Sequence, residues 1–298
     1  MTGNRRGLPL LAVAVSVVLW STAFALSGIV LNTSSPAVLS VGRFVIALAV
    51  LVPFALRRPG FGAALRSPRT IVLGLTSTTL YYSFTNIGLL FTTPGTVALA
   101  NALLPVFTTV LAVFVLRERP PVRTVIGLAL ATIGVALVAA AGFSFDPGIV
   151  LVAIGLAAYS VYTVLLRRGA GRDDAPDALV LATATAIWGT ALMLPWLGFE
   201  AITGGARLPS DAAGIVSLVF LGLVVTAPTV VLFNYGAERL PAAISGISIA
   251  GIPALGYAFA VALGEVPVPI KVLGGVIALV GIVVATVASP RIEPRPPI

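Results

Sequence analysis

Long apolar stretches separated by short charged connectors are the feature that most constrains this chain. Only 9% of its 298 residues are charged, whereas 58% are hydrophobic; a soluble domain carries about 25% charged residues. A helix needs about 20 mostly apolar residues to cross the hydrocarbon layer of a membrane, and the stretches have this length. The pattern therefore predicts an all-helical, polytopic integral membrane protein.

Hydropathy divides the chain into ten predicted transmembrane helices, joined by short connectors that contain helix-ending pairs such as Pro94-Gly95. Such short links place successive helices side by side and antiparallel. Arg5-Arg6 before an apolar run also resembles a secretory signal, but the run continues to Leu31, which favours a retained first helix. The predicted spans are Leu8–Leu31, Ala37–Leu56, Thr70–Phe91, Gly95–Leu116, Thr124–Ala141, Gly148–Leu166, Ala178–Leu197, Ala213–Tyr235, Ala242–Gly264 and Lys271–Ala288.

The basic residues predict the orientation, because cytoplasmic loops carry an excess of Lys and Arg. With a cytoplasmic N-terminus, fifteen of the eighteen basic residues lie inside: Arg5, Arg6, Arg57, Arg58, Arg66, Arg69, Arg117, Arg119, Arg123, Arg167, Arg168, Arg172, Arg239, Arg291 and Arg295. Arg207 and Lys271 lie outside, and Arg43 lies within a span. The composition is typical of a GC-rich bacterium, so we expect a multi-pass protein of the bacterial inner membrane with both termini in the cytoplasm.

The chain lacks the residues that several classes of function require. It contains no Cys and no His, which removes disulfides, thiolate nucleophiles, imidazole chemistry and most zinc sites. A G-x-x-x-x-G-K phosphate-binding motif is also absent. The net charge of +8 is spread over short loops, whereas nucleic-acid binding needs it on one folded, soluble face. We therefore expect no enzyme activity, cofactor, metal or nucleic-acid partner.

An internal repeat organises the chain. Four residues recur 148 positions later, as Gly74/Gly222, Asn86/Asn234, Gly88/Gly236 and Pro105/Pro253, and three recur 147 positions later, as Glu118/Glu265, Gly127/Gly274 and Gly134/Gly281. We assign residues 1–142 to a first five-helix repeat, 143–290 to a second, and 291–298 to a short cytoplasmic tail. An odd number of helices gives the two copies opposite orientations, and inverted-repeat transporters bind substrate near the bilayer midplane, between the repeats.

These residues resemble the EamA-type members of the drug/metabolite transporter superfamily, over essentially the whole chain. The resemblance rests on Trp20-Ser21, Arg43-Phe44, Pro105 followed by Glu118, the glycines of the fifth helix, and the same series in the second half, where Gly264 precedes Glu265. It implies a ten-helix carrier that exports amino acids, their derivatives or other small metabolites, with exporters of aromatic and other amino acids as the nearest members. The seventh helix has no counterpart of Arg43.

The leading function is a secondary carrier that works by alternating access on a small-molecule substrate in the lipid bilayer. An exporter of organic cations or drugs, a channel and a membrane-bound sensor are the alternatives. We expect a monomer, with a homodimer as the alternative. All ten acidic residues fall in loops or at helix ends, which predicts facilitated diffusion without obligatory proton coupling.

The candidate substrate-binding residues are polar and aromatic side chains near mid-membrane, where Tyr and Trp are unusual. Arg43 either holds a substrate carboxylate through a bidentate contact, pairs with Glu265, or extends to the interface. The other candidates are Trp20, Ser21, Tyr81, Tyr82, Asn101, Tyr159, Tyr162, Trp188, Thr226, Ser245 and Ser248.

The remaining signals concern helix packing and shape. Pro105, Pro228 and Pro253 lie near mid-span, where each is either a packing kink or a hinge. The glycines spaced seven apart in the fifth and tenth helices predict close helix contact. We expect Glu118 and Glu265 to act as helix-end caps or partners of Arg.

Overall fold

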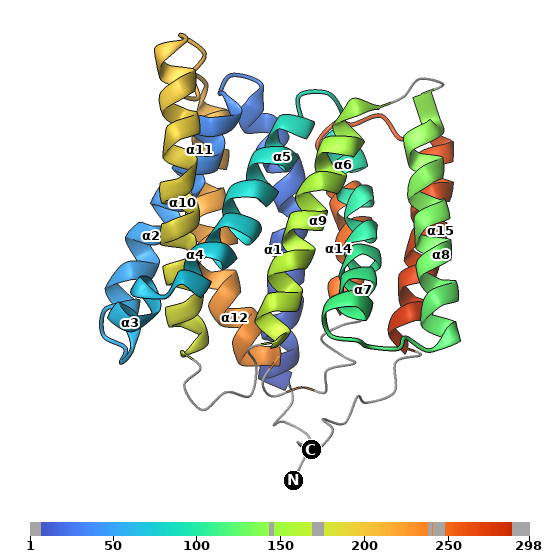
Figure 1. Cartoon of the computed structure of the whole chain (residues 1–298). Coiled ribbons are helices and arrows are strands. Elements are labelled where there is room, and N and C mark those ends of the chain that lie inside the picture. Colours follow the sequence, from blue (N-terminus) through green and yellow to red (C-terminus); the bar gives the residue numbers. More distant parts are fainter. Residues whose placement is uncertain (1–6, 143–145, 169–175, 238–239, 241–247, 288–298) are drawn as a thin grey trace, which may run out of the picture.

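The computed structural model describes residues 7–142, 146–168, 176–237, 240 and 248–287, and every regular element in these ranges is helical. Most of the helices run as roughly parallel rods between two opposite ends of the molecule (Figure 1). Eight of the described helices are long and apolar enough to cross a membrane. Large apolar side chains such as Phe114 and Phe199 are more than half exposed, as expected where helices face lipid.

Six of the predicted spans form uninterrupted helices. They are α1 (Gly7–Leu31), α2 (Pro36–Ala55), α8 (Val122–Ala139), α9 (Pro147–Arg168), α10 (Ala178–Ile202) and α15 (Pro269–Val287). Three of these helices begin at proline, whose missing N–H costs nothing in the first turn and whose φ is already helical. The predicted boundaries thus hold to within a few residues for these elements, apart from the end of α10.

Three further spans are helices made of consecutive segments. They are α4 (Pro68–Gly74), η1 (Leu75–Leu80) and α5 (Tyr81–Gly88); α6 (Pro94–Ala100), η2 (Asn101–Leu103) and α7 (Leu104–Val115); and α11 (Ala212–Phe220), η4 (Leu221–Thr226) and α12 (Ala227–Ala237). The first of them is not among the eight long apolar helices. The predicted span Ala242–Gly264 is described only from Ser248, as a shorter apolar helix that contains α14 (Ile252–Ala262). The number ten therefore stays a prediction. Short helices, α3 (Phe61–Arg66) and η3 (Ala140–Gly142), lie in or beside connectors.

The three mid-span prolines each lie in the first turn of a helical segment. Pro105 follows the 3₁₀ turn η2, Pro228 follows the π-helical segment η4, and Pro253 follows a turn at Gly251. Proline cannot donate the backbone hydrogen bond of a continuing helix, and each of these prolines directly follows such an interruption. Whether each proline acts as a packing kink or as a hinge stays a prediction.

Helices α8 and α15 lie against each other along their length (Figure 1), with their backbones in contact through glycines of both repeats. A Cβ atom at Gly134 would lie 2.5 Å from the carbonyl oxygen of Gly274, and one at Gly127 would lie 2.5 Å from that of Gly281. The contacts are reciprocal, because Gly127 corresponds to Gly274 in the repeat and Gly134 to Gly281. The predicted close contact is confirmed, and its reciprocity reflects the two inverted repeats.

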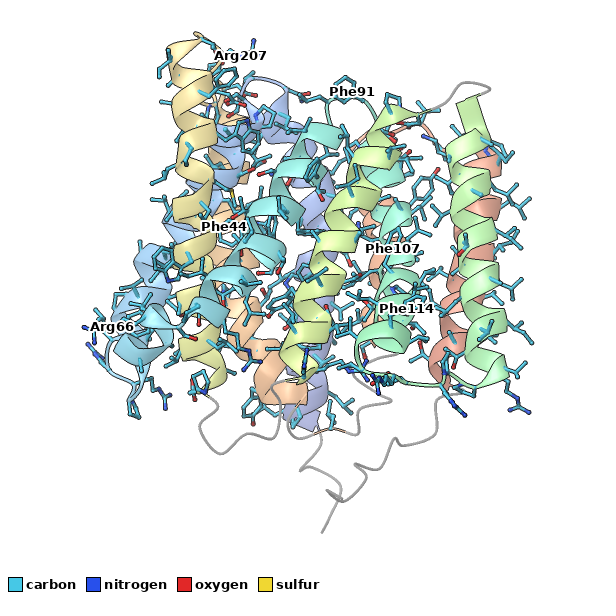
Figure 2. All side chains as sticks on the ribbon, viewed as in Figure 1. Phe44, Arg66, Phe91, Phe107, Phe114 and Arg207 are labelled. Carbon is cyan, nitrogen blue, oxygen red and sulfur yellow. The ribbon has the colours of Figure 1, made fainter. Side chains whose placement is uncertain are left out.

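The two ends of the bundle match the predicted charge asymmetry. Arg66 and Arg207, which the positive-inside rule assigns to opposite sides of the membrane, lie at opposite ends of the molecule (Figure 2). The start of α1 and the end of α15 lie at the same end as Arg66. Which of these ends faces the cytoplasm stays a prediction.

Candidate functional site

A cavity of about 150 Å³, lined by aromatic, aliphatic and hydroxyl side chains and by one arginine, lies between the two repeats. At about 30 Å³ per water molecule, this volume equals roughly five waters. Its walls come from α1, α2, η1, α5, α9, α10, η4 and α12, so both repeats contribute. The lining residues are Trp20, Arg43, Phe44, Leu51, Ser77, Thr78, Tyr82, Tyr159, Tyr162, Ala182, Thr185, Ala186, Thr226 and Thr229.

Two π-helical segments, η1 and η4, border this cavity from opposite repeats. Thr78 and Thr226, which line it, are 148 residues apart and follow Gly74 and Gly222 by the same four positions. In η4 the widened turn is closed by a side chain, since the hydroxyl of Thr226 donates to the carbonyl oxygen of Leu221 at 2.7 Å. π-Helical turns inside helices are rare and frequent at functional sites.

Glycines let each π-helical segment approach a helix of the other repeat. A Cβ atom at Gly74 would lie 2.6 Å from the carbonyl oxygen of Thr185 on α10. One at Gly222 would lie 2.6 Å from the Cβ of Ile46 on α2. The repeat pair Gly74/Gly222 therefore places the two segments symmetrically around the cavity.

Arg43 is the central charged group of the cavity and is only 4% exposed. Its Nε donates a hydrogen bond of 2.6 Å to Thr226 Oγ1, and its guanidinium carbon lies 4.9 Å from the centre of the Tyr82 ring. No carboxylate of the described residues forms an ion pair with it. The alternatives in which Arg43 pairs with Glu265 or extends to the interface are therefore wrong, because the side chain is held inside the cavity and Glu265 binds elsewhere.

Aromatic rings form a continuous wall beside Arg43. Neighbouring ring centres are 4.8 Å apart for Phe44 and Tyr82, 4.9 Å for Tyr81 and Tyr82, 5.0 Å for Tyr81 and Tyr159, and 5.2 Å for Tyr159 and Tyr162. These are tilted or edge-on contacts, the arrangement that aromatic pairs prefer. Trp20 lies on another wall, 5.0 Å from the ring of Phe233.

The structure brings together six of the predicted candidates, which are far apart in the sequence. The cavity is lined by Trp20, Arg43, Tyr82, Tyr159, Tyr162 and Thr226. Tyr81 joins Tyr82 to Tyr159 in the aromatic wall but does not itself line the cavity, and its hydroxyl donates to Asn101 Oδ1 at 3.3 Å.

Other candidates do not line the cavity. The Ser21 hydroxyl donates to the carbonyl of Val17, and the Asn101 amide donates to that of Val97. The indole N–H of Trp188 donates to the carbonyl of Leu65, 2.7 Å away, at the connector before α4. Ser248 lies ahead of α14 and is not in the lining, and Ser245 falls outside the described residues.

Sequence reasoning missed the hydroxyl groups of Ser77, Thr78, Thr185 and Thr229, all of which line the cavity. The hydroxyls of Ser77, Thr185 and Thr229 each donate to a carbonyl four residues earlier in the same helix, so they look like ordinary helix-interior residues. The repeated Gly-x-x-x-Thr spacing at Gly74 and Gly222 was the available signal for Thr78.

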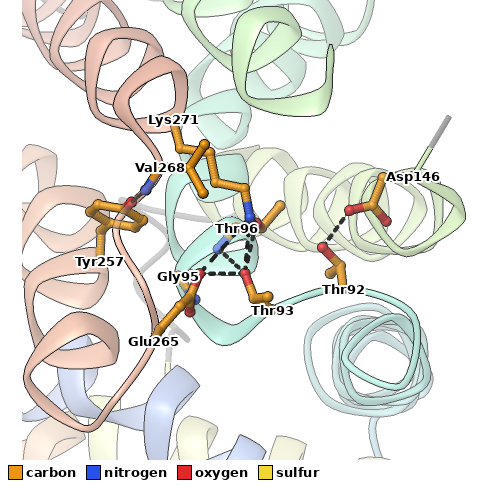
Figure 3. Close-up of polar contacts among 9 residues, drawn as sticks. All are labelled: Thr92, Thr93, Gly95, Thr96, Asp146, Tyr257, Glu265, Val268 and Lys271. Atoms are coloured by element: carbon orange, nitrogen blue, oxygen red, sulfur yellow. Dashed lines mark hydrogen bonds and ion pairs between the residues drawn. The ribbon is translucent and has the colours of Figure 1, made fainter. Parts of the chain in front are cut away.

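A second, more open pocket of about 500 Å³ lies where α1, α5, α6 and α14 end or begin, and Glu265 is part of its lining. Glu265 accepts hydrogen bonds from the hydroxyl of Thr93 at 2.5 Å and from the backbone N–H of Gly95 at 2.7 Å (Figure 3). Lys271 lies 3.9 Å from the same carboxylate and donates to Thr96. Glu265 therefore caps the start of α6, as predicted.

The repeat counterpart of Glu265 is Glu118, which forms an ion pair with Arg167 at 3.1 Å. Both side chains of this pair are partly exposed. The predicted role as an Arg partner at a helix end is confirmed for Glu118.

Apolar helices in two inverted repeats around a cavity that holds a buried arginine define a multi-pass membrane transporter. The chain belongs to the EamA-like transporter family, whose profile matches residues 7–140 and 146–287. The expected membership of the drug/metabolite transporter superfamily is thereby confirmed.

Two known proteins of similar sequence are named as transporters, and one solved structure has the same fold. A protein of Streptantibioticus cattleyicolor named "Probable terminal-alkyne amino-acid exporter" is 33% identical over 91% of both chains. An uncharacterized transporter of Archaeoglobus fulgidus is 24% identical over 89% of this chain and 93% of its own. A solved crystal structure has the same fold, with a TM-score of 0.68 at 24% identity, covering 98% of this chain and 100% of the other.

Proposed function

We propose that this transporter exports amino acids or related small carboxylated metabolites across the bacterial inner membrane by alternating access. The observation that carries the proposal is Arg43, a buried cation whose described partners are a hydroxyl and an aromatic ring. The name of the relative from Streptantibioticus cattleyicolor supports the same substrate class.

A carboxylate is the group that this arrangement fits best. A buried charge is costly unless it is paired and hydrogen-bonded, and the two terminal nitrogens of Arg43 form no hydrogen bond to a described residue. Guanidinium groups bind carboxylates through two parallel hydrogen bonds. The rings of Phe44, Tyr82 and Tyr159 would then contact the apolar part of the substrate.

The same charge disfavours the alternative of organic cations and drugs. A cationic substrate in the cavity would lie close to Arg43 in a medium of low dielectric constant, where repulsion between like charges is strong. The described residues that line the cavity include no carboxylate to offset it.

Counterflow in proteoliposomes tests the proposal. Liposomes loaded with an unlabelled candidate should take up labelled phenylalanine when the candidate is a substrate, and a panel of amino acids, organic cations and nucleotide sugars covers the alternatives. Within this panel, we expect exchange with amino acids only. Arg43→Gln should strongly reduce it, whereas Arg207→Gln, a change at an exposed residue, should not. Exchange with organic cations that survives Arg43→Gln would contradict the proposal, and a steady conductance in planar bilayers would indicate a channel instead.

A further inference from the structure

The cavity around Arg43 carries one permanent positive charge. Arg stays protonated at every pH at which proteins fold. The other polar groups in the lining are hydroxyls, such as those of Thr78, Tyr82 and Thr226. None of the described lining residues is acidic. Glu118 and Glu265 lie at helix ends instead, where Glu118 pairs with Arg167 and Glu265 with Lys271. The described lining therefore has a net charge of +1.

This charge determines how a substrate changes the electrostatics of the cavity. A zwitterionic amino acid brings one carboxylate and one ammonium group, so the net charge of the loaded cavity remains +1. A monoanionic carboxylate brings only the negative charge, so the loaded cavity becomes neutral. Because an uncompensated buried charge is expensive, the neutral loaded state is the more stable one.

The ring of Tyr82, which lies next to Arg43, does not provide a separate place for the ammonium group. A cation can lie over the face of a Tyr ring, but Arg43 already lies 4.9 Å from the centre of Tyr82. Tyr82 is in edge contact with Phe44 and Tyr81. An ammonium group over the Tyr82 ring would therefore lie close to the guanidinium, where the two like charges repel.

We propose that this cavity binds monoanionic carboxylates that lack an ammonium group, such as 2-hydroxy acids and N-acylated amino acids, in preference to zwitterionic amino acids. The inference rests on the function proposed above, because it takes the Arg43 cavity as the substrate site. The selectivity follows from charge balance and is independent of the identity of the side chain that the substrate carries.

Three compounds of nearly the same shape separate the charge states. They are L-phenylalanine, a zwitterion; L-3-phenyllactate, in which a hydroxyl replaces the ammonium; and L-phenylalaninamide, a cation. Binding is measured by titration calorimetry on the purified full chain in lipid nanodiscs, with empty nanodiscs as the blank. We expect phenyllactate to bind at least tenfold more tightly than phenylalanine, and phenylalaninamide not to bind. Phenylalanine binding as tightly as phenyllactate, or more tightly, overturns the inference.

Two variants locate the source of the preference. Arg43→Lys keeps the positive charge and should keep the preference for phenyllactate, although with weaker binding. Arg43→Gln removes the charge and should abolish the preference; a preference that persists in a folded Arg43→Gln protein overturns the inference. If Arg43→Gln does not fold or binds neither compound, Arg43→Lys still decides, because loss of the preference there would contradict a charge-based origin.

The outcomes also separate this inference from the proposed function. If phenylalanine and phenyllactate both bind and are exchanged, with phenylalanine the tighter ligand, the carrier function stands and the selectivity is wrong. If no compound binds and counterflow fails for the whole panel, the proposed function itself is wrong.

Discussion

Arg43 Nε donates a hydrogen bond of 2.6 Å to Thr226 Oγ1, which joins the second helix of the first repeat to the π-helical segment of the second. The same hydroxyl donates to the carbonyl of Leu221. Thr226 Oγ1 therefore has two partners: it accepts from the guanidinium, and it donates to a carbonyl of the widened turn. This contact fixes the direction of the guanidinium, whose terminal nitrogens form no hydrogen bond to a described residue.

Thr226→Val should weaken substrate binding while the protein stays folded. Valine has the shape of threonine but cannot accept from Arg43, and a hydrogen bond to a charged group contributes about 1.5–3 kcal/mol. We expect affinity to fall roughly tenfold, measured as the half-saturating concentration in counterflow. Thr183→Val is the matched control, because Thr183 is buried on α10 and its hydroxyl donates to the carbonyl of its own helix at Leu179. Equal effects of both changes would show that Thr226 acts through helix stability alone.

The aromatic wall should matter more for transport than for folding. Trp20→Ala, Tyr82→Ala and Tyr159→Ala each remove a ring that lines the cavity, so uptake should fall by more than the yield of detergent-stable protein. Trp188→Ala should do the reverse, because its indole bonds to Leu65 outside the cavity. The two quantities to compare are initial uptake rate per folded molecule and yield after size-exclusion chromatography. Normal transport by the surviving Tyr82→Ala protein would contradict a pocket role.

The beginning and end of most membrane spans could be predicted from the sequence, but the direction in which each side chain points could not. Span length is set by the thickness of the membrane, so Leu8–Leu31 was found as α1 with an error of one residue. Trp188 was correctly placed inside a span, yet it faces the connector before α4, because hydropathy does not report the face of an almost uniformly apolar helix. The partner of Arg43 was unpredictable for another reason: it depends on a π-helical turn, which no residue propensity encodes.

The glycine contact between α8 and α15 should tolerate no side chain. Gly134→Ala would place a Cβ atom 2.5 Å from the carbonyl oxygen of Gly274, and relieving such overpacking typically costs about 1–3 kcal/mol. Gly198→Ala, in α10, is the control, since a Cβ atom there meets nothing within 4 Å and alanine favours the helix by about 1 kcal/mol. Thermal unfolding in detergent should show a lower melting temperature for Gly134→Ala and no decrease for Gly198→Ala. A melting temperature unchanged by both would show that the two helices separate easily.

The orientation can be measured directly because the chain contains no cysteine. Leu208→Cys and Gly62→Cys introduce thiols at exposed positions near Arg207 and Arg66, at opposite ends of the bundle. An impermeant maleimide added to intact cells should label Leu208→Cys and should label Gly62→Cys only after the membrane is opened. The reverse pattern would invert the predicted topology.

The last prediction concerns the source of energy. Proton-coupled carriers commonly use an acidic residue or His inside the membrane, and the described acidic residues of this chain lie at helix ends or in connectors, with Glu265 held by Thr93, Gly95 and Lys271. We therefore expect facilitated diffusion down the substrate gradient. Liposomes with equal substrate on both sides and an imposed pH gradient should show no net accumulation. Glu265→Gln keeps the shape of the cap and should leave exchange intact, and Glu118→Gln, at the repeat-related position, should do the same. Accumulation driven by the pH gradient in the unaltered protein, and lost in either variant, would show proton coupling and identify the carboxylate responsible.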